Sequence, residues 1–126
     1  MKNILVVDDS ATMRRMVKNC LKELSDVQMH DAASGLEAIE RLAIGSVDLM
    51  ILDLNMPDMH GLEVLRFVRE HSAFSKIPIV VLTTKGDEAT RAEALKRGAS
   101  VYLTKPFVPA DLVTHARHLM KENCHG

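Results

Sequence analysis

The sequence has few of the residues that mark proteins held together by disulfides or structural metals. It contains no Trp, one Tyr, three Phe and only two Cys among 126 residues. Cys20 and Cys124 lie far apart, and no spacing of Cys and His resembles a zinc site. We therefore expect free thiols and a location in the reducing cytoplasm.

The net charge argues against a protein that binds nucleic acid or a membrane surface, and the short hydrophobic runs argue against a membrane-spanning protein. The net charge is −1, without the basic excess of a nucleic-acid or membrane-surface protein. No apolar segment approaches the ~20 residues of a membrane span, and the N-terminal Met-Lys-Asn leads into a strand rather than a signal peptide. The length favours one domain over residues 1–126, with no separate output domain.

Short hydrophobic runs alternate with amphipathic stretches along the whole chain. Such alternation predicts an α/β fold with a parallel sheet covered by helices on both faces. The predicted strands are Ile4–Val7, Val27–Ala32, Leu49–Leu52, Pro78–Leu82 and Ser100–Leu103. The predicted helices run from a Ser10 cap to about Leu24, over Gly35–Ala43, over Gly61–Glu70, from Asp87 to before Gly98, and from Pro109 onward.

Helical spacing also predicts which helix faces are buried. The first helix is expected to bury Met13, Met16, Val17, Cys20, Leu21 and Leu24, and the second Leu36, Ile39, Leu42 and Ala43. The fourth offers only Ala89, Ala92, Ala94 and Leu95, which predicts loose packing. The basic residues of the first helix are assigned to its solvent-exposed face, namely Arg14, Arg15, Lys18 and Lys22.

Polar residues follow four of the five predicted strands. Asp8 and Asp9 come after the first strand, Asp53 after the third, Thr83 after the fourth and Lys105 after the fifth. The carboxyl ends of parallel strands share one edge of a sheet, and open α/β sheets bind their ligands there. The sequence therefore predicts that these side chains gather at one site.

Three neighbouring carboxylates repel one another, and a bound cation removes that cost. Oxygen ligands beside solvent suit Mg²⁺, with Asp9 and Asp53 as direct ligands, Asp8 holding a coordinated water and the Asn55 backbone carbonyl adding an oxygen. A phosphoryl group accepted by Asp53 would then meet Lys105 and the Thr83 hydroxyl.

Each of these residues also has a purely structural interpretation. Asp8 and Asp9 suit the start of a helix, Asp53 suits a loop, and Lys105 suits a solvent-exposed surface. Each structural interpretation is the simpler one when its residue is taken alone. Their joint occurrence at one sheet edge favours the site.

Four segments resemble the motifs of the bacterial response-regulator receiver domain, and the likeness covers essentially the whole chain. They are Val6–Ser10, Leu52–Gly61, Leu82-Thr83 and Tyr102–Phe107. Three shorter stretches look most similar to the stand-alone chemotaxis regulators of the CheY type, namely Thr12–Arg15, Lys22–Leu24 and Asn55–Pro57.

The resemblance implies a flavodoxin-like fold with strand order 2-1-3-4-5. It implies that Asp53 takes phosphate from a CheA-like histidine kinase, that Asp8 and Asp9 serve Mg²⁺, and that the Lys105-Pro106 peptide bond is cis. It also implies a switch in which Thr83 moves toward the phosphoryl group and Tyr102 follows. The implied role is signalling rather than enzymatic, with a flagellar motor switch protein or a phosphotransfer protein as the output partner.

Two departures and three alternatives remain open. Thr84 stands where the family usually has a smaller residue, and Asn55 and Lys85 flank the site at positions where hydrolysis rates vary in the family. A phosphorelay intermediate competes with a chemotaxis regulator. A Mg²⁺-dependent phosphohydrolase is disfavoured because Asn55 replaces the expected second acid. A flavin-binding flavodoxin relative is disfavoured because two acids occupy the expected phosphate loop.

Overall fold

The central sheet has five parallel strands in the order β2-β1-β3-β4-β5, which confirms the predicted fold class. The computed structural model describes residues 1–56, 60–84 and 86–124. The strands are β1 (Lys2–Val7), β2 (Val27–Ala32), β3 (Leu49–Leu52), β4 (Ile79–Thr83) and β5 (Val101–Thr104). The helices are α1 (Ala11–Leu21), α2 (Gly35–Ile44), α3 (Gly61–Glu70), α4 (Glu88–Lys96) and α5 (Pro109–Cys124).

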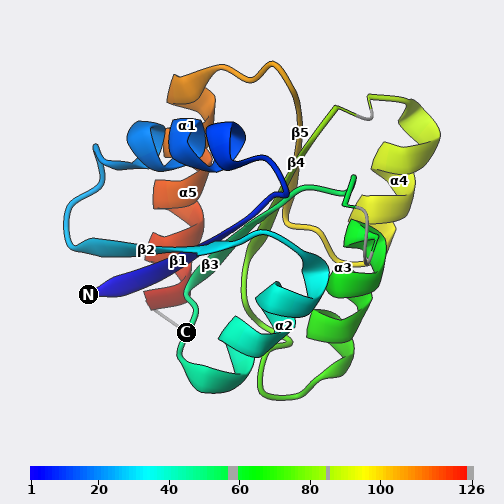
Figure 1. Ribbon diagram of the computed structural model, residues 1–126, viewed down its shortest axis with the longest axis horizontal. Coiled ribbons are helices and arrows are strands. Elements are labelled where there is room, and N and C mark those ends of the chain that lie inside the picture. The colour runs from blue at the N-terminus through cyan, green and yellow to red at the C-terminus, as the bar shows by residue number, and fades with distance from the viewer. Residues whose placement is uncertain (57–59, 85, 125–126) are drawn as a thin grey trace.

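Both faces of the sheet are covered, with α1 and α5 on one side and α2, α3 and α4 on the other (Figure 1). Successive side chains of a strand point to opposite faces, so each central strand contributes to two hydrophobic cores. In β1, Ile4 and Val6 pack on the α1 and α5 side, whereas Leu5 and Val7 pack on the other. This double burial explains why the central strands are continuous hydrophobic runs in the sequence.

The helices begin where the sequence predicts caps. The Ser10 hydroxyl accepts a hydrogen bond from the Met13 N–H at 3.2 Å, and Ser34 accepts one from the Glu37 N–H at 3.1 Å. Asp87 caps α4 by accepting from the Thr90 N–H at 3.0 Å. Each side-chain oxygen satisfies an amide group that has no partner within the helix.

The predicted buried face of α2 is confirmed at Leu42 but wrong at Leu36 and Ala43. Leu36 is 58% exposed and Ala43 is exposed, whereas Gly35, Ala38 and Leu42 are buried. The buried three also recur at three- and four-residue steps, so periodicity alone did not distinguish the two stripes. Met16 of α1, which is 48% exposed, is a second error of this kind.

Helix α4 buries only Ala94, in line with the thin apolar side predicted for it. Its C-terminal end is nevertheless held firmly. The Arg69 guanidinium donates from Nε to the Gly98 carbonyl at 3.0 Å and from Nη1 to the Ile77 carbonyl at 2.6 Å. Arg69 therefore ties the turn after α4 to α3, while the rest of α4 has little hydrophobic anchorage.

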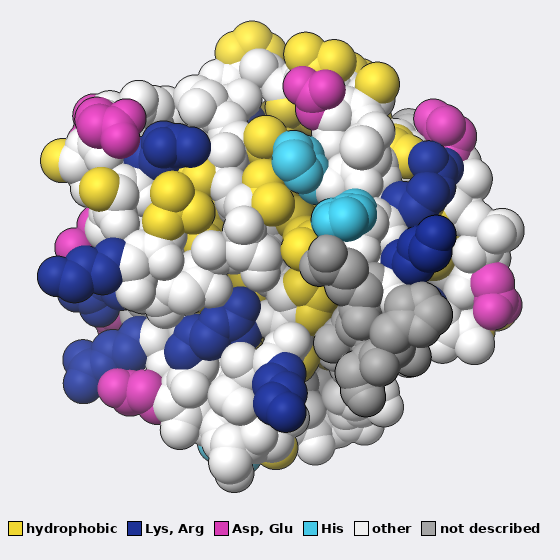
Figure 2. All heavy atoms as spheres, turned by 180° about the vertical axis from the view of Figure 1, so that it is seen from behind, with side chains coloured by type: hydrophobic (Ala, Val, Ile, Leu, Met, Phe, Trp, Pro, Cys, Tyr) yellow, Lys and Arg dark blue, Asp and Glu magenta, His cyan; other side chains and the backbone are white. Residues whose placement is uncertain are grey.

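The surface agrees with the balanced charge of the chain. In the view from behind, Lys and Arg side chains lie on both sides of the face with Asp and Glu side chains among them (Figure 2). Among the described residues of this face, basic and acidic side chains are therefore interspersed. Within the described part of the chain, no helix has the length and apolarity needed to cross a membrane.

Gly61 lets α3 begin directly against the loop that follows β3. A Cβ at this position would lie 2.5 Å from the Leu54 Cα and 2.6 Å from the Asp53 carbonyl oxygen. Backbone atoms do not move aside as a flexible side chain does. We predict that Gly61→Ala lowers the free energy of unfolding by about 1–3 kcal/mol, the usual cost of overpacking, measured by urea denaturation.

Gly45, at the end of α2, provides the matched control. An added Cβ there meets nothing within 4 Å, and its φ of −162° is extended backbone open to any residue. Gly45→Ala should leave the free energy of unfolding unchanged or raise it by up to ~1 kcal/mol, because Ala lowers the conformational entropy of the unfolded chain. Equal effects of the two substitutions would contradict the close packing described for Gly61.

Candidate functional site

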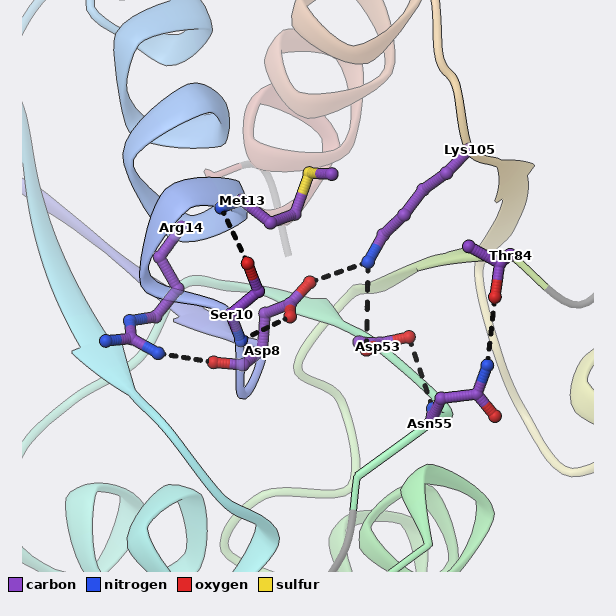
Figure 3. A network of polar contacts seen from close by, with 8 residues as sticks. All are labelled: Asp8, Ser10, Met13, Arg14, Asp53, Asn55, Thr84 and Lys105. Carbon is purple, nitrogen blue, oxygen red and sulfur yellow. Dashed lines mark hydrogen bonds and ion pairs between the residues drawn. The ribbon is translucent and has the colours of Figure 1, made fainter.

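Strands β1, β3, β4 and β5 deliver the site residues to one edge of the sheet. Val7 pairs with Leu52 in the parallel register, and Thr83 pairs with Thr104. The residues that follow these positions are Asp8, Asp53 and Lys105, and they lie together in Figure 3. A shared register at the carboxyl edge thus brings together side chains up to 97 positions apart in sequence.

Three carboxylates form the acidic part of the site. Asp8, Asp9 and Asp53 each offer one oxygen, and the three oxygens lie within 4.8 Å of one another. Asp8 and Asp53 are buried, whereas Asp9 is exposed. Carboxylate oxygens with access to water are the donors that Mg²⁺ prefers, so this set fits the cation implied by the sequence.

Lys105 supplies the positive charge of the site. Its Nζ lies 2.8 Å from Asp8 Oδ2 and 3.7 Å from Asp53 Oδ2, and its side chain is only 11% exposed. The Lys105 N–H donates to the Thr83 carbonyl at 2.8 Å, which fixes the start of the following loop. The Lys105-Pro106 bond is cis, as the family resemblance implied.

Asp53 lies in an environment that disfavours its charged form. Burial raises the pKa of its carboxyl group, and the nearby Asp8 charge adds to the rise. The Asn55 N–H, which donates to Asp53 Oδ1 at 3.2 Å, acts in the opposite direction, as do Lys105 and a hydrogen bond from Thr83. Together these effects raise the pKa of Asp53, and a bound cation would favour the charged form of its carboxyl group.

Thr83 and Tyr102, the two predicted switch residues, are both buried. Thr83 is the last residue of β4 and is fully buried, and Tyr102 of β5 pairs with Val81 and is 9% exposed. Burial raises the pKa of the Tyr102 phenol, and the Asp87 charge adds to the rise. The phenol is therefore in electrostatic reach of Asp87, the residue that caps α4.

A polar bridge flanks the access to Asp53. The Asn55 Nδ2 donates to Thr84 Oγ1 at 3.0 Å, and both residues are exposed. Thr84, the departure from the family pattern, thus has a specific partner beside the site. The Asn55 carbonyl as a metal ligand stays a prediction, and Lys85 lies outside the described residues.

One basic residue at the site was assigned to the wrong environment by the sequence. Arg14 was placed with the other bases of α1 on the solvent-exposed face, but its side chain is only 16% exposed. Its Nη1 donates to the Asp8 carbonyl at 2.6 Å, and its Nε donates to Asp31 Oδ2 at 3.0 Å. The useful signal was the four-residue step from Arg14 to Lys18, since both contact the same acid on β2.

The raised pKa of Asp53 has a consequence for stability. The unfolded chain ionises this carboxyl group at its ordinary pKa of about 3.9, and the folded chain only at a higher pH. The neutral carboxyl group of Asp53 therefore gives its full contribution to the stability of the fold below the ordinary pKa. This contribution is lost as the pH rises through the pKa of the folded state. We predict that Asp53→Asn raises the free energy of unfolding at neutral pH in metal-free buffer, and that the gain fades on acidification toward about pH 4.

Asp48→Asn is the control, since Asp48 lies just before the other end of β3. Its Oδ2 accepts from the Asn3 N–H at 2.7 Å, so its removal relieves no comparable crowding of charge. Denaturation midpoints measured across this pH range should separate the two variants. A gain for Asp53→Asn that does not change with pH would contradict the electrostatic explanation.

The comparisons with known proteins agree on one family. The sequence model of the response regulator receiver domain matches residues 4–117. The chain is 46% identical over 107 residues to the chemotaxis protein CheY1 of Helicobacter pylori, which covers 84% of this chain and 86% of that protein.

Two solved structures show the same likeness. The chemotaxis response regulator CheY4 of Vibrio cholerae superposes with a TM-score of 0.85 and 34% identity, over 94% of this chain and 98% of that one. The Mn²⁺-bound form of response regulator Rcp1 has a TM-score of 0.80 and 31% identity, over 94% and 91% of the two chains. The chain therefore belongs to the response regulator receiver family, whose members are signalling proteins phosphorylated on an aspartate.

Proposed function

We propose that this chain is a signalling switch in which Asp53 accepts a phosphoryl group in a Mg²⁺-dependent reaction. The observation that carries the proposal is the meeting of three carboxylates with the ammonium group of Lys105, whose side chain is only 11% exposed. Asp53 is the carboxylate at the end of the central strand β3, and it is contacted by both Lys105 and Thr83. An ammonium group and a hydroxyl group beside Asp53 can both bind the oxygens of a phosphoryl group.

The proposed transfer joins Asp53 to a phosphoryl group carried by a histidine of a sensor kinase. A carboxylate oxygen of Asp53 attacks phosphorus, the phosphorus–nitrogen bond breaks, and the imidazole leaves with the bonding electron pair and takes up a proton. The Lys105 ammonium, already 3.7 Å from Asp53 Oδ2, would pair with an oxygen of the transferred group. The Thr83 hydroxyl would donate a hydrogen bond to the same group.

Asp8, Asp9 and Asp53 would hold the Mg²⁺ ion, with the Asn55 carbonyl as a further oxygen. When bound, the cation offsets the repulsion between the attacking carboxylate and the anionic phosphoryl group. The donor set consists of oxygens, and the exposure of Asp9 leaves room for the waters that Mg²⁺ retains. The Mn²⁺ in the Rcp1 structure supports this part of the proposal, because Mn²⁺ and Mg²⁺ share a preference for oxygen ligands.

The proposed output is a change at the α4 and β5 face. Thr83 is the last residue of β4 and lies at the site. Tyr102 lies on the neighbouring strand β5, and the charge of Asp87, the cap of α4, acts on its phenol. Helix α4 buries only Ala94, so its N-terminal part has little packing to resist a shift. Movement of Thr83 toward a phosphoryl group would leave space that Tyr102 can enter.

The relatives favour a role in chemotaxis over other signalling roles. The proteins compared above include two named as chemotaxis regulators. We propose that the chain acts as a single receiver domain in the cytoplasm, phosphorylated by a CheA-like histidine kinase and binding a flagellar motor switch protein. A phosphotransfer protein is the alternative partner, as in a phosphorelay.

The acceptor is tested by chemical phosphorylation. Incubation with phosphoramidate and Mg²⁺ should add the mass of one phosphoryl group to the intact protein, and peptide analysis should locate it on Asp53. Asp53→Asn should abolish the adduct, while Asp48→Asn should retain it. Chelation of Mg²⁺ should suppress labelling of the wild type. An adduct on another residue, or labelling unaffected by chelation, would overturn the proposed reaction.

The partner is tested by binding before and after phosphorylation. We predict that the phosphorylated chain, but not the Asp53→Asn variant, is retained by the purified motor switch protein of the same organism. The measurement is a pull-down repeated with a phosphotransfer protein as bait. Retention by the phosphotransfer protein alone would replace the chemotaxis role with a phosphorelay, and binding independent of phosphorylation would contradict a switch.

A further inference from the structure

Arg14 contacts the backbone of the acidic site rather than its side chains. From α1 the guanidinium points toward the loop after β1, where Nη1 donates to the Asp8 carbonyl at 2.6 Å (Figure 3). A hydrogen bond from a charged donor at this distance is among the stronger kinds found in proteins. Arg14 therefore acts on the peptide unit that joins Asp8 to Asp9.

The guanidinium is itself held from the opposite side. Its Nε donates to Asp31 Oδ2 at 3.0 Å, and the Lys18 ammonium lies 2.6 Å from Asp31 Oδ1. Burial alone would raise the pKa of the Asp31 carboxyl group, but the hydrogen bonds from Lys18 and Arg14 outweigh it and lower the pKa. Asp31 pairs with Val6 in the register of β2 and β1, so this anchor is built into the sheet.

With Arg14 included, Asp8 is restrained at three points. The Ser10 N–H donates to Oδ1 at 2.9 Å, Lys105 Nζ lies 2.8 Å from Oδ2, and Arg14 holds the carbonyl. Asp9 differs: within the described residues no hydrogen bond or ion pair reaches its carboxylate. The direction of the Asp9 side chain therefore depends on the orientation of the peptide unit that Arg14 fixes.

We propose that Arg14 is a positioning residue for divalent-cation binding, acting through the Asp8–Asp9 peptide unit and anchored by Asp31. This inference rests on the proposed function, because it concerns the same cation site. It assigns to Arg14 a role distinct from that of Lys105, whose ammonium contacts the carboxylates directly. It also assigns Asp31, on the edge strand, an indirect part in the site.

Whether removal of Arg14 weakens or tightens Mg²⁺ binding distinguishes a positioning role from a purely electrostatic one. Arg14 is a cation beside a cation site, so by Coulomb's law alone its removal should tighten Mg²⁺ binding. If Arg14 orients Asp9, its removal should weaken binding, and loss of a group that orients a metal ligand typically costs about 10-fold or more in affinity.

The test is Mg²⁺ binding by isothermal titration calorimetry to the full chain. Arg14→Gln should raise the dissociation constant about 10-fold. Arg15→Gln is the matched control, since it removes the same charge from the adjacent, exposed residue and should leave the constant unchanged or slightly lower. The backbone amide nitrogen shift of Asp9, measured without metal, should change in Arg14→Gln and not in Arg15→Gln.

Asp31→Asn provides a second variant if Arg14→Gln folds poorly. It keeps Arg14 but removes the charge that anchors it, and it should weaken Mg²⁺ binding by a smaller factor while shifting the Asp9 amide in the same direction. Unchanged or tighter binding in Arg14→Gln, with normal wild-type binding, would overturn the positioning role alone. Failure of the wild type to bind Mg²⁺ would overturn both this inference and the proposed reaction.

Discussion

An excess of negative charge at the carboxyl edge of the sheet governs the chemistry of the site. Asp8, Asp9 and Asp53 bring three negative charges together, and Lys105 supplies one positive charge in direct contact. Two negative charges are left over, which is the complement of a divalent cation. Burial makes the imbalance costly, as the raised pKa of Asp53 shows.

The sheet topology connects Asp53 to the strands next to α4. Asp53 follows the central strand, and the neighbouring β4 and β5 carry Thr83 and Tyr102 toward α4. The C-terminal end of α4 is tied to α3 by Arg69, whereas its body buries only Ala94. A change in charge at Asp53 is therefore connected to the helix that has the least packing to hold it in place.

The strands and the order of elements could be predicted from the sequence because strands buried on both faces appear as continuous hydrophobic runs. The bounds of Val27–Ala32 and Leu49–Leu52 agree with the structure, and the Ser10, Ser34 and Asp87 caps mark helix starts. The gathering of acids and Lys105 followed from the parallel order alone. These features depend on local chemistry and on a rule of topology.

The errors arose where tertiary contacts choose between local alternatives. On α2 two stripes were possible, and the sheet buries the one with Ala38 rather than Leu36. On α1 four bases suggested one solvent-exposed face, but Asp31 of β2 draws Arg14 and Lys18 inward. On α2 nothing within the helix distinguishes the two stripes. On α1 the four-residue step from Arg14 to Lys18 becomes informative only together with Asp31 on the neighbouring strand.

A crystal structure with Mg²⁺ and beryllium fluoride, a stable mimic of the phosphoryl group, would show whether the site binds both. We predict one Mg²⁺ with Asp9 and Asp53 oxygens at about 2.1 Å, and the fluoride on Asp53 in contact with Lys105 and Thr83. A cation bound away from these carboxylates, or a fluoride on any other residue, would contradict it.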